Sequence, residues 1–194
     1  IYSDLELKTE AVLPGSQVAI DGNETDVSFS LGLTAELSKN TRLGLVYWYG
    51  VEIDYSGDLT RNPLNITVAA DTNIVYPQSI RTGIYHKVND KLAMVGTIGW
   101  ENWRKLENVN LTVGVGTVPV PKNWEDTWHF SAGLHYRISD PWLLQCGIAY
   151  DTSPVDSVNR TADMAVDRQI RYAVGALYEW SEKLSIGGQF KYMD

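Results

Sequence analysis

Apolar and polar residues alternate with a period of two along most of this chain. In the segment 128–138 every second residue, from Trp128 to Ile138, is apolar, and the residues between them are small or polar. A strand places successive side chains on opposite faces, so this pattern predicts β-strands with one apolar and one polar face. The same stripe recurs at 27–37, 43–55, 142–150, 170–180 and 184–192, and segments at about 4–12, 78–88 and 91–103 complete nine predicted strands.

The connections between these strands alternate between short and long. Four are short, at 38–41, 88–91, 138–141 and 180–183, and three are long, at roughly 58–77, 104–125 and 152–167. Tight turns at one end of a set of hairpins and long loops at the other are typical of an outer-membrane β-barrel. The sequence therefore predicts an all-β fold, an antiparallel transmembrane β-barrel.

Aromatic residues lie near the ends of the apolar stripes, with aliphatic residues between them. Trp and Tyr prefer the membrane–water interface, so this arrangement predicts two aromatic girdles around an apolar band. The alternative is a soluble β-sandwich with aromatic rims, but soluble strands average only about 5–6 residues. The predicted interface residues are Trp128, Tyr136, Trp142, Tyr150, Tyr178 and Trp180.

Composition narrows the class further. The chain has 194 residues, and seven Trp and eleven Tyr against three Phe fit the girdle prediction. A net charge of −8 argues against nucleic acid as a partner, and the single cysteine, Cys146, excludes a disulfide scaffold. Single-chain bacterial barrels have an even number of strands, so nine predicted strands indicate that at least one is missing.

Several sequence runs resemble the FadL/TodX family of outer-membrane transporters of hydrophobic compounds. They are TRLGLVY at 41–47, DYSGD at 54–58, WEDT at 124–127 with SAGLHY at 131–136, DTSPV at 151–155, and GALY at 175–178 before the final hairpin. The resemblance implies a barrel of about fourteen strands plugged by an N-terminal hatch. On this basis residues 1–194 form one barrel domain, corresponding to the C-terminal half, from which the hatch and the last strand are absent.

Catalytic and metal-binding patterns are sparse. Ser153 and Ser157 lie near acidic residues, but no Gly-x-Ser-x-Gly turn is present. His129 and His135 share one face of one strand, about 20 Å apart, too far to bind one metal ion. We therefore expect no enzyme activity, no metal site and no cofactor, although a Ser–His pair of an outer-membrane phospholipase is the alternative. Lining histidines with satisfied polar partners are the simpler interpretation.

The polar face supplies candidate binding residues. In a barrel it lines the lumen, where a cation can meet the carboxylate of a fatty acid; the alternative is ordinary solvated or paired lining residues. By resemblance to the family, Asp126 and either Arg168 or Arg171 stand at strand ends near the long loops, where they could pair or receive a head group. The candidate substrate-binding residues are Asp126, Arg168, Arg171, Arg81 and Trp103.

The predicted function is passive uptake of long-chain fatty acids or other hydrophobic compounds across a bacterial outer membrane, by a monomeric barrel whose partners are membrane lipid and the substrate. The apolar segment within 58–77 is either a groove that first captures substrate or a loop that packs on its surroundings. The alternative function is a small structural or adhesive barrel, since eight strands can close around an interior filled by side chains.

Overall fold

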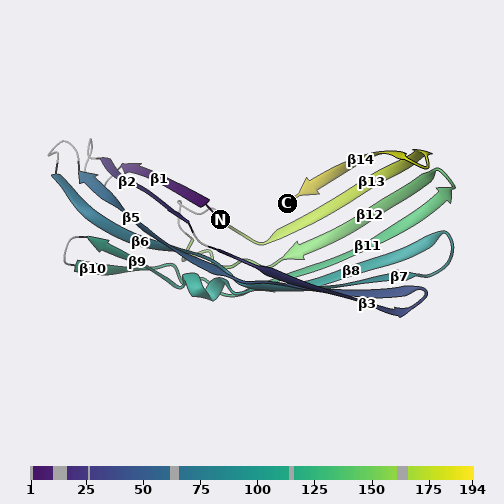
Figure 1. Ribbon diagram of the computed structural model, residues 1–194, viewed down its shortest axis with the longest axis horizontal. Coiled ribbons are helices and arrows are strands. Elements are labelled where there is room, and N and C mark those ends of the chain that lie inside the picture. The colour runs from purple at the N-terminus through teal and green to yellow at the C-terminus, as the bar shows by residue number, and fades with distance from the viewer. Residues whose placement is uncertain (1, 11–16, 26, 62–65, 114–115, 161–165) are drawn as a thin grey trace.

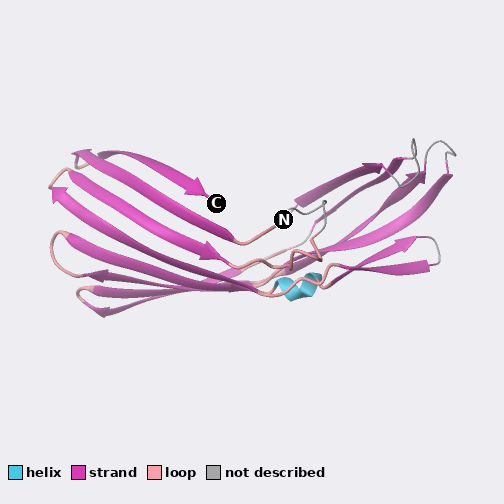
Figure 2. Ribbon diagram, turned by 180° about the vertical axis from the view of Figure 1, so that it is seen from behind, coloured by secondary structure: helices cyan, strands magenta, loops and turns pink. Residues whose placement is uncertain are grey.

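The chain is almost entirely β-structure. The computed structural model describes residues 2–10, 17–25, 27–61, 66–113, 116–160 and 166–194 (Figures 1 and 2). No helix among these residues is long and apolar enough to cross a membrane. The elements are β1 (Tyr2–Glu10), β2 (Gln17–Thr25), β3 (Ser30–Ser38), β4 (Thr41–Trp48), β5 (Val51–Arg61), β6 (Ile66–Tyr76), β7 (Ser79–Lys87), β8 (Leu92–Glu101), the short 3-10 turn η1 (Trp103–Leu106), β9 (Asn108–Val113), β10 (Gly116–Pro121), β11 (Thr127–Ser139), β12 (Trp142–Asp151), β13 (Gln169–Ser181) and β14 (Leu184–Met193).

The strands form two antiparallel sheets joined end to end. Eight strands pair in the order β14-β13-β12-β11-β8-β7-β4-β3, and six pair in the order β1-β2-β5-β6-β9-β10. Only residues 49–50 separate β4 from β5, and only residues 77–78 separate β6 from β7, so the chain runs from one sheet directly into the other. We call this junction, with η1 beside it, the waist; in Figure 1 the eight-stranded sheet lies to its right and the six-stranded sheet to its left.

The predicted strand at 43–55 is interrupted at the waist. β4 ends at Trp48 and β5 begins at Val51. At Gly50 the neighbouring backbone comes so near that a Cβ atom would lie 2.5 Å from the amide nitrogen of Gln78 and 2.7 Å from the carbonyl oxygen of Tyr76. A residue without a side chain is needed for so close an approach. The period-two pattern passes through this break, which is why the sequence alone predicts one strand there.

All four predicted short turns are confirmed, and they lie at one end of the eight-stranded sheet, on the right in Figure 1. In the β7–β8 turn the Asn89 side chain accepts hydrogen bonds from the amides of Lys91 and Leu92, both at 2.9 Å. Lys87 Nζ donates to Asp90 at 2.6 Å. This hydrogen bond, together with the positive charge of Lys87, lowers the pKa of Asp90. Local side-chain bonds of this kind fix where each hairpin reverses.

The long connections differ from the prediction. Most of 58–77 and part of 104–125 are strand, since β5 pairs with β6 and β9 with β10 as hairpins beyond the waist. Only the third, after β12, is loop in its described part. The N-terminal region likewise holds two strands, β1 and β2, where the sequence predicts one. These segments alternate weakly because they are polar on both faces or carry short apolar runs, which period-two reasoning assigns to loops.

The eight-stranded sheet has an apolar face and a polar face. Register partners lie on the same face, so Leu134 of β11 stands beside Met94 of β8 and Cys146 of β12 on the apolar face. Apolar side chains on this face remain exposed along the sheet. On the strands between the edge strands β3 and β14, the polar face is more covered, as expected on the concave side of a curved sheet. The exposed apolar-face side chains include Leu31, Leu33, Leu45, Ile84, Ile98, Phe130, Leu144, Ile148, Val174, Ile186 and Phe190.

The aromatic residues occupy the two ends of the apolar face. Trp128 and Tyr150 lie towards the waist, and Tyr136, Trp142 and Trp180 lie towards the short turns, all with exposed side chains. Tyr178 packs against Trp142 with ring centroids 4.8 Å apart. The eight residue-to-residue steps from Trp128 to Tyr136 span about 27 Å of strand, close to the ~25 Å apolar band of an outer-membrane barrel. Contact of these rings with the membrane interface stays a prediction.

Few apolar side chains are buried in the described part of the chain. The buried ones are Val51, Ile53, Ala70, Val75, Ala93, Leu106, Trp124 and Val155, and most of them lie at or beyond the waist. No second sheet covers the apolar face among the described residues. A soluble sandwich buries such a face against a second sheet. The sandwich alternative is therefore wrong, and this face needs an apolar surrounding other than protein core.

Cys146 tests which face meets lipid. It lies near the middle of β12 on the apolar face. We expect Cys146→Arg to destabilise the folded protein in lipid vesicles by roughly 2–4 kcal/mol, because the charge would stand near the bilayer midplane. Gln145→Arg, one position away on the polar face, should cost far less. Urea unfolding in vesicles measures both, and rapid labelling of Cys146 by a membrane-impermeant thiol reagent would contradict the assignment.

Candidate functional site

The polar face of the eight-stranded sheet carries a row of small side chains. Successive register pairs align Thr34, Gly44, Gly83, Thr97, Ser131 and Ala149 on six neighbouring strands, and the next residue in the row is Arg171 on β13. Small side chains leave open space above a sheet. A groove of about 440 Å³ lies over the β11–β14 part of this face. Its polar-face lining is Val95, His129, Ser131, Gly133, His135, Gln145, Gly147, Ala149, Arg171, Ala173, Gly175, Gln189 and Lys191.

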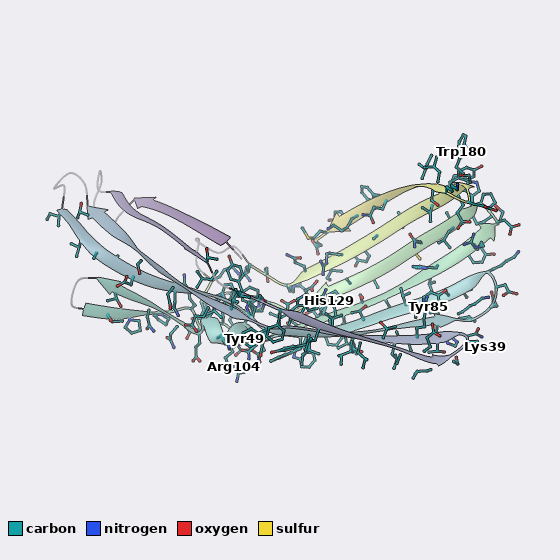
Figure 3. All side chains as sticks on the ribbon, viewed as in Figure 1. Lys39, Tyr49, Tyr85, Arg104, His129 and Trp180 are labelled. Atoms are coloured by element: carbon teal, nitrogen blue, oxygen red, sulfur yellow. The ribbon has the colours of Figure 1, made fainter. Side chains whose placement is uncertain are left out.

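An ionic cluster of three residues closes the waist end of this groove. His129 and Asp151 are register partners on β11 and β12, and His129 Nδ1 lies 2.7 Å from Asp151 Oδ1. The guanidinium of Arg171, on β13, donates to the other carboxylate oxygen of Asp151. These side chains are only 13 to 30% exposed. The cluster therefore links three neighbouring strands across the polar face; Figure 3 labels His129 at this position.

A second ionic contact lies beside the first. Arg81 of β7 donates to Glu101 of β8 at 3.4 Å, and Trp103 Nε1 of η1 donates to the other Glu101 oxygen at 3.0 Å. Gly99 makes room for this arrangement, because a Cβ atom there would lie 3.2 Å from Arg81 Nε and 3.3 Å from the Cβ of His129. Arg81 and Trp103, both predicted site residues, are thus brought together through Glu101.

Trp103 also belongs to a small apolar core at the waist. Its ring meets that of Trp124 edge-on, with centroids 5.2 Å apart. Trp124 is buried with Val75, Leu106 and Val155. These residues come from β6, η1 and the segments before β11 and after β12, so the core ties four parts of the chain together. Trp103 is held by packing as well as by its bond to Glu101.

Asp126 and Arg168 are placed differently from the prediction. Asp126 accepts hydrogen bonds from Trp100 Nε1 at 3.2 Å and from the backbone amide of Arg104 at 3.1 Å. The proposed pair between Asp126 and Arg171 is wrong, because Arg171 binds Asp151. Arg168 is exposed and makes no ion pair within the described residues. Register explains the difference: Trp100 faces Trp128 on the apolar face, two residues beyond Asp126.

Sequence reasoning did not pair Glu101 with Arg81 or Asp151 with Arg171, and it assigned His129 no partner. These partners could have been found by counting outward from each short turn. Residues at equal distances from a turn are register partners on the two strands that it joins, and alternate residues share a face. His135 bonds to Gln145 at 3.3 Å and His86 to Thr41 at 2.9 Å. Each histidine therefore has a polar partner, as the simpler interpretation predicts.

Catalytic and metal-binding geometry is missing from the residues that the structure describes. No Ser–His hydrogen bond occurs among them, and Ser153 Oγ donates to the carbonyl oxygen of Val155 instead. No group of three or more His, Cys, Asp or Glu side chains there is arranged to hold a metal ion. The polar face of the eight-stranded sheet instead offers a groove and paired charges.

An exposed apolar face, a lining face of small and paired polar residues, and short turns at one end define a wall of an outer-membrane β-barrel. The family model described as outer membrane protein transport protein (OMPP1/FadL/TodX) matches residues 13–194. The chain belongs to this family.

Known relatives agree. The chain is 25% identical over 191 residues to the long-chain fatty acid transport protein of Escherichia coli K12, covering 90% of this chain and 43% of that protein. It is 24% identical over 203 residues to the 47 kDa outer membrane protein of Pasteurella multocida, covering 94% and 47%. The chain therefore spans about half the length of the curated relatives it matches.

Solved structures confirm the fold. A crystal structure of a Pseudomonas aeruginosa FadL homologue matches with a TM-score of 0.79 at 17% identity, covering 99% of this chain and 52% of that one. A crystal structure of the toluene transporter TodX of P. putida matches with a TM-score of 0.56 at 17% identity, covering 98% and 46%. The two open sheets are thus part of a larger antiparallel barrel.

Arg171 in β13 and Arg168 just before this strand give a matched test of the ionic cluster. Arg171→Gln should destabilise the folded protein by about 1–3 kcal/mol, because it leaves the half-buried Asp151 without its charged donor. Arg168→Gln should stay within about 0.5 kcal/mol, as for other exposed positions. Urea unfolding in vesicles measures both changes. Equal free energies of unfolding for the two variants would show that the Arg171–Asp151 contact does not stabilise the folded protein.

Proposed function

We propose that the protein gives hydrophobic compounds a passive route across the bacterial outer membrane, working as a monomeric barrel without catalysis or cofactor. The observation that carries the proposal is the groove of about 440 Å³ on the polar face, floored by small side chains and lying behind a wall whose other face is apolar. Membership of a family described as outer membrane transport proteins supports a transport function. Names of relatives extend it to long-chain fatty acids and to toluene-like compounds.

The energetics favour a chain-like or flat apolar molecule in such a groove. Gly133, Gly147 and Gly175 leave its floor bare, and their neighbour Ala173 adds a single methyl group. An apolar substrate gains about 0.8 kcal/mol for each CH₂ removed from water. A route of this kind needs no energy source, because the substrate moves down its own gradient.

The alternative, a structural or adhesive barrel with a packed lumen, requires bulky inward side chains. The row of small side chains from Thr34 to Ala149 on the polar face favours an open path instead. Within the proposed function, substrate contact by Asp126, Arg168, Arg171, Arg81 and Trp103 stays a prediction.

Two alanines of β13 lie on opposite faces of the sheet, so replacing each of them tests the groove and the apolar face separately. Ala173 lines the groove, whereas Ala176 lies among apolar-face residues. We expect Ala173→Trp to lower protein-dependent uptake of a radiolabelled hydrophobic compound about tenfold, since the indole would fill much of the groove. Ala176→Trp should leave uptake near that of the unchanged protein.

The measurement uses the complete gene expressed in a bacterium that lacks its own transporters of this kind. Heat-dependent mobility of the barrel in detergent gels, measured in parallel, shows that each variant is folded. Equal uptake by two folded variants would contradict passage along the groove, and absence of uptake by the unchanged protein would contradict the function itself.

A further inference from the structure

The charges of the chain are divided unequally by the waist. The described residues on the β5–β6 side, in β1, β2, β5, β6, β9, β10 and the adjoining connections, carry 14 Asp and Glu against 7 Lys and Arg. The remaining segments, at 27–50, 77–102, 127–151 and 169–194, carry 8 against 9. The described residues on the side away from the short turns therefore carry a net charge of −7, whereas the remaining described residues carry a net charge of +1. In an outer-membrane barrel that side faces the exterior.

A solute entering from outside meets this acidic region first. Glu52, Asp54 and Asp71 are exposed on β5 and β6, where the strands extend beyond the waist. Several like charges on one surface raise the local concentration of cations and lower that of anions, with effects on association rates that reach factors of about 10–1000. A carboxylate such as that of a fatty acid is therefore disfavoured before it reaches the groove.

Three arginines farther along the polar face are already paired. Arg171 binds Asp151, Arg81 binds Glu101, and on the short-turn side Arg137 binds Glu179 at 3.1 Å. A carboxylate that took either waist arginine would have to displace a carboxylate held in place by the strands. The displaced group would then lie half-buried without a partner, which is strongly unfavourable.

Two further cations on the strands of this face make no ion pair within the described residues, whereas Lys87 is paired with Asp90. Arg42 stacks over the ring of Tyr85, 4.8 Å from its centroid, near the short turns; Figure 3 labels Tyr85 on that side of His129. Lys191 lines the groove from β14 and makes no ion pair within the described residues. Lys191 is the residue through which an anionic substrate would most directly be held, so it is included in the test below.

We propose that this protein selects uncharged hydrophobic compounds over carboxylates, with the acidic strands beyond the waist and the paired arginines at the waist acting together as the selective element. This inference rests on the proposed function and names its substrate class. An uncharged alcohol, ester or hydrocarbon crosses both regions without disturbing an ion pair. A long-chain carboxylate of the same apolar length gains the same burial in the groove, but it meets repulsion outside, and the two polar-face arginines at the waist, Arg171 and Arg81, are already paired.

The experiment compares a radiolabelled long-chain fatty acid with the primary alcohol of the same carbon number. Uptake of each is measured at pH 7 and low ionic strength in cells that express the complete gene, against cells that lack it. We expect protein-dependent uptake of the alcohol to exceed that of the acid by about tenfold or more. The difference should narrow in ~0.15 M salt, where the screening length falls to about 8 Å.

Variants test whether the ion pairs at the waist cause the preference for the alcohol over the acid. Asp151→Asn and Glu101→Gln each free one arginine, and both should raise uptake of the acid several-fold relative to the alcohol. Glu182→Gln, in the exposed β13–β14 turn, makes the same change in net charge at the other end and should leave the ratio unchanged. Lys191→Gln is the counter-test, because a head group held at Lys191 would make uptake of the acid depend on this residue. Because two different carboxylates are replaced, failure of one variant to fold still leaves the other to decide.

Three results overturn the inference. Uptake of the acid as fast as that of the alcohol shows that charge is not selected, while the proposed function stands. Loss of acid uptake in Lys191→Gln shows that Lys191 receives a head group. Uptake of neither compound contradicts the proposed function and this inference together.

Discussion

Inside a bilayer, backbone amides and carbonyls have no water to bond with, so they must bond to one another. The eight-stranded sheet meets this constraint with long, regular registers: β11 pairs with β8 without interruption from Thr127↔Glu101 to Tyr136↔Leu92. Once every strand is paired on both sides, side chains can point only to two faces. The apolar face, the lining face and the positions of the aromatic residues all depend on this requirement.

The same registers decide which polar groups meet. His129 stands opposite Asp151, and Ala149 stands opposite Arg171, so the arginine reaches diagonally to the carboxylate. Small residues in the neighbouring row, such as Ser131, leave the space through which these longer side chains extend. Paired charges at the waist and an open groove beside them are thus two results of one alignment of strands. Function on this face depends on register as much as on residue type.

The sequence predicted the features that depend on neighbours along the chain. Period-two stripes identified the faces, and short polar segments such as 88–91 identified the turns. It could not predict features that depend on the approach of distant segments. Gly50 looks like any strand glycine until the backbone at Gln78 is placed against it. The family resemblance offered Asp126 as a partner of either Arg168 or Arg171, but the β12–β13 register brings Arg171 to Asp151 instead.

The hairpin beyond the waist is inserted between two strands that pair directly. Trp48↔Ser79 is the last pair of the β4–β7 ladder, and Val51↔Tyr76 is the first of the β5–β6 ladder that follows it. Every residue added to one arm of this hairpin can be matched by a residue on the other arm, at its tip. The exterior part of the protein can therefore lengthen or shorten during evolution while the membrane-spanning ladder keeps its alignment. In this architecture the length of the outer segments is therefore a variable separate from the alignment of the eight-stranded wall.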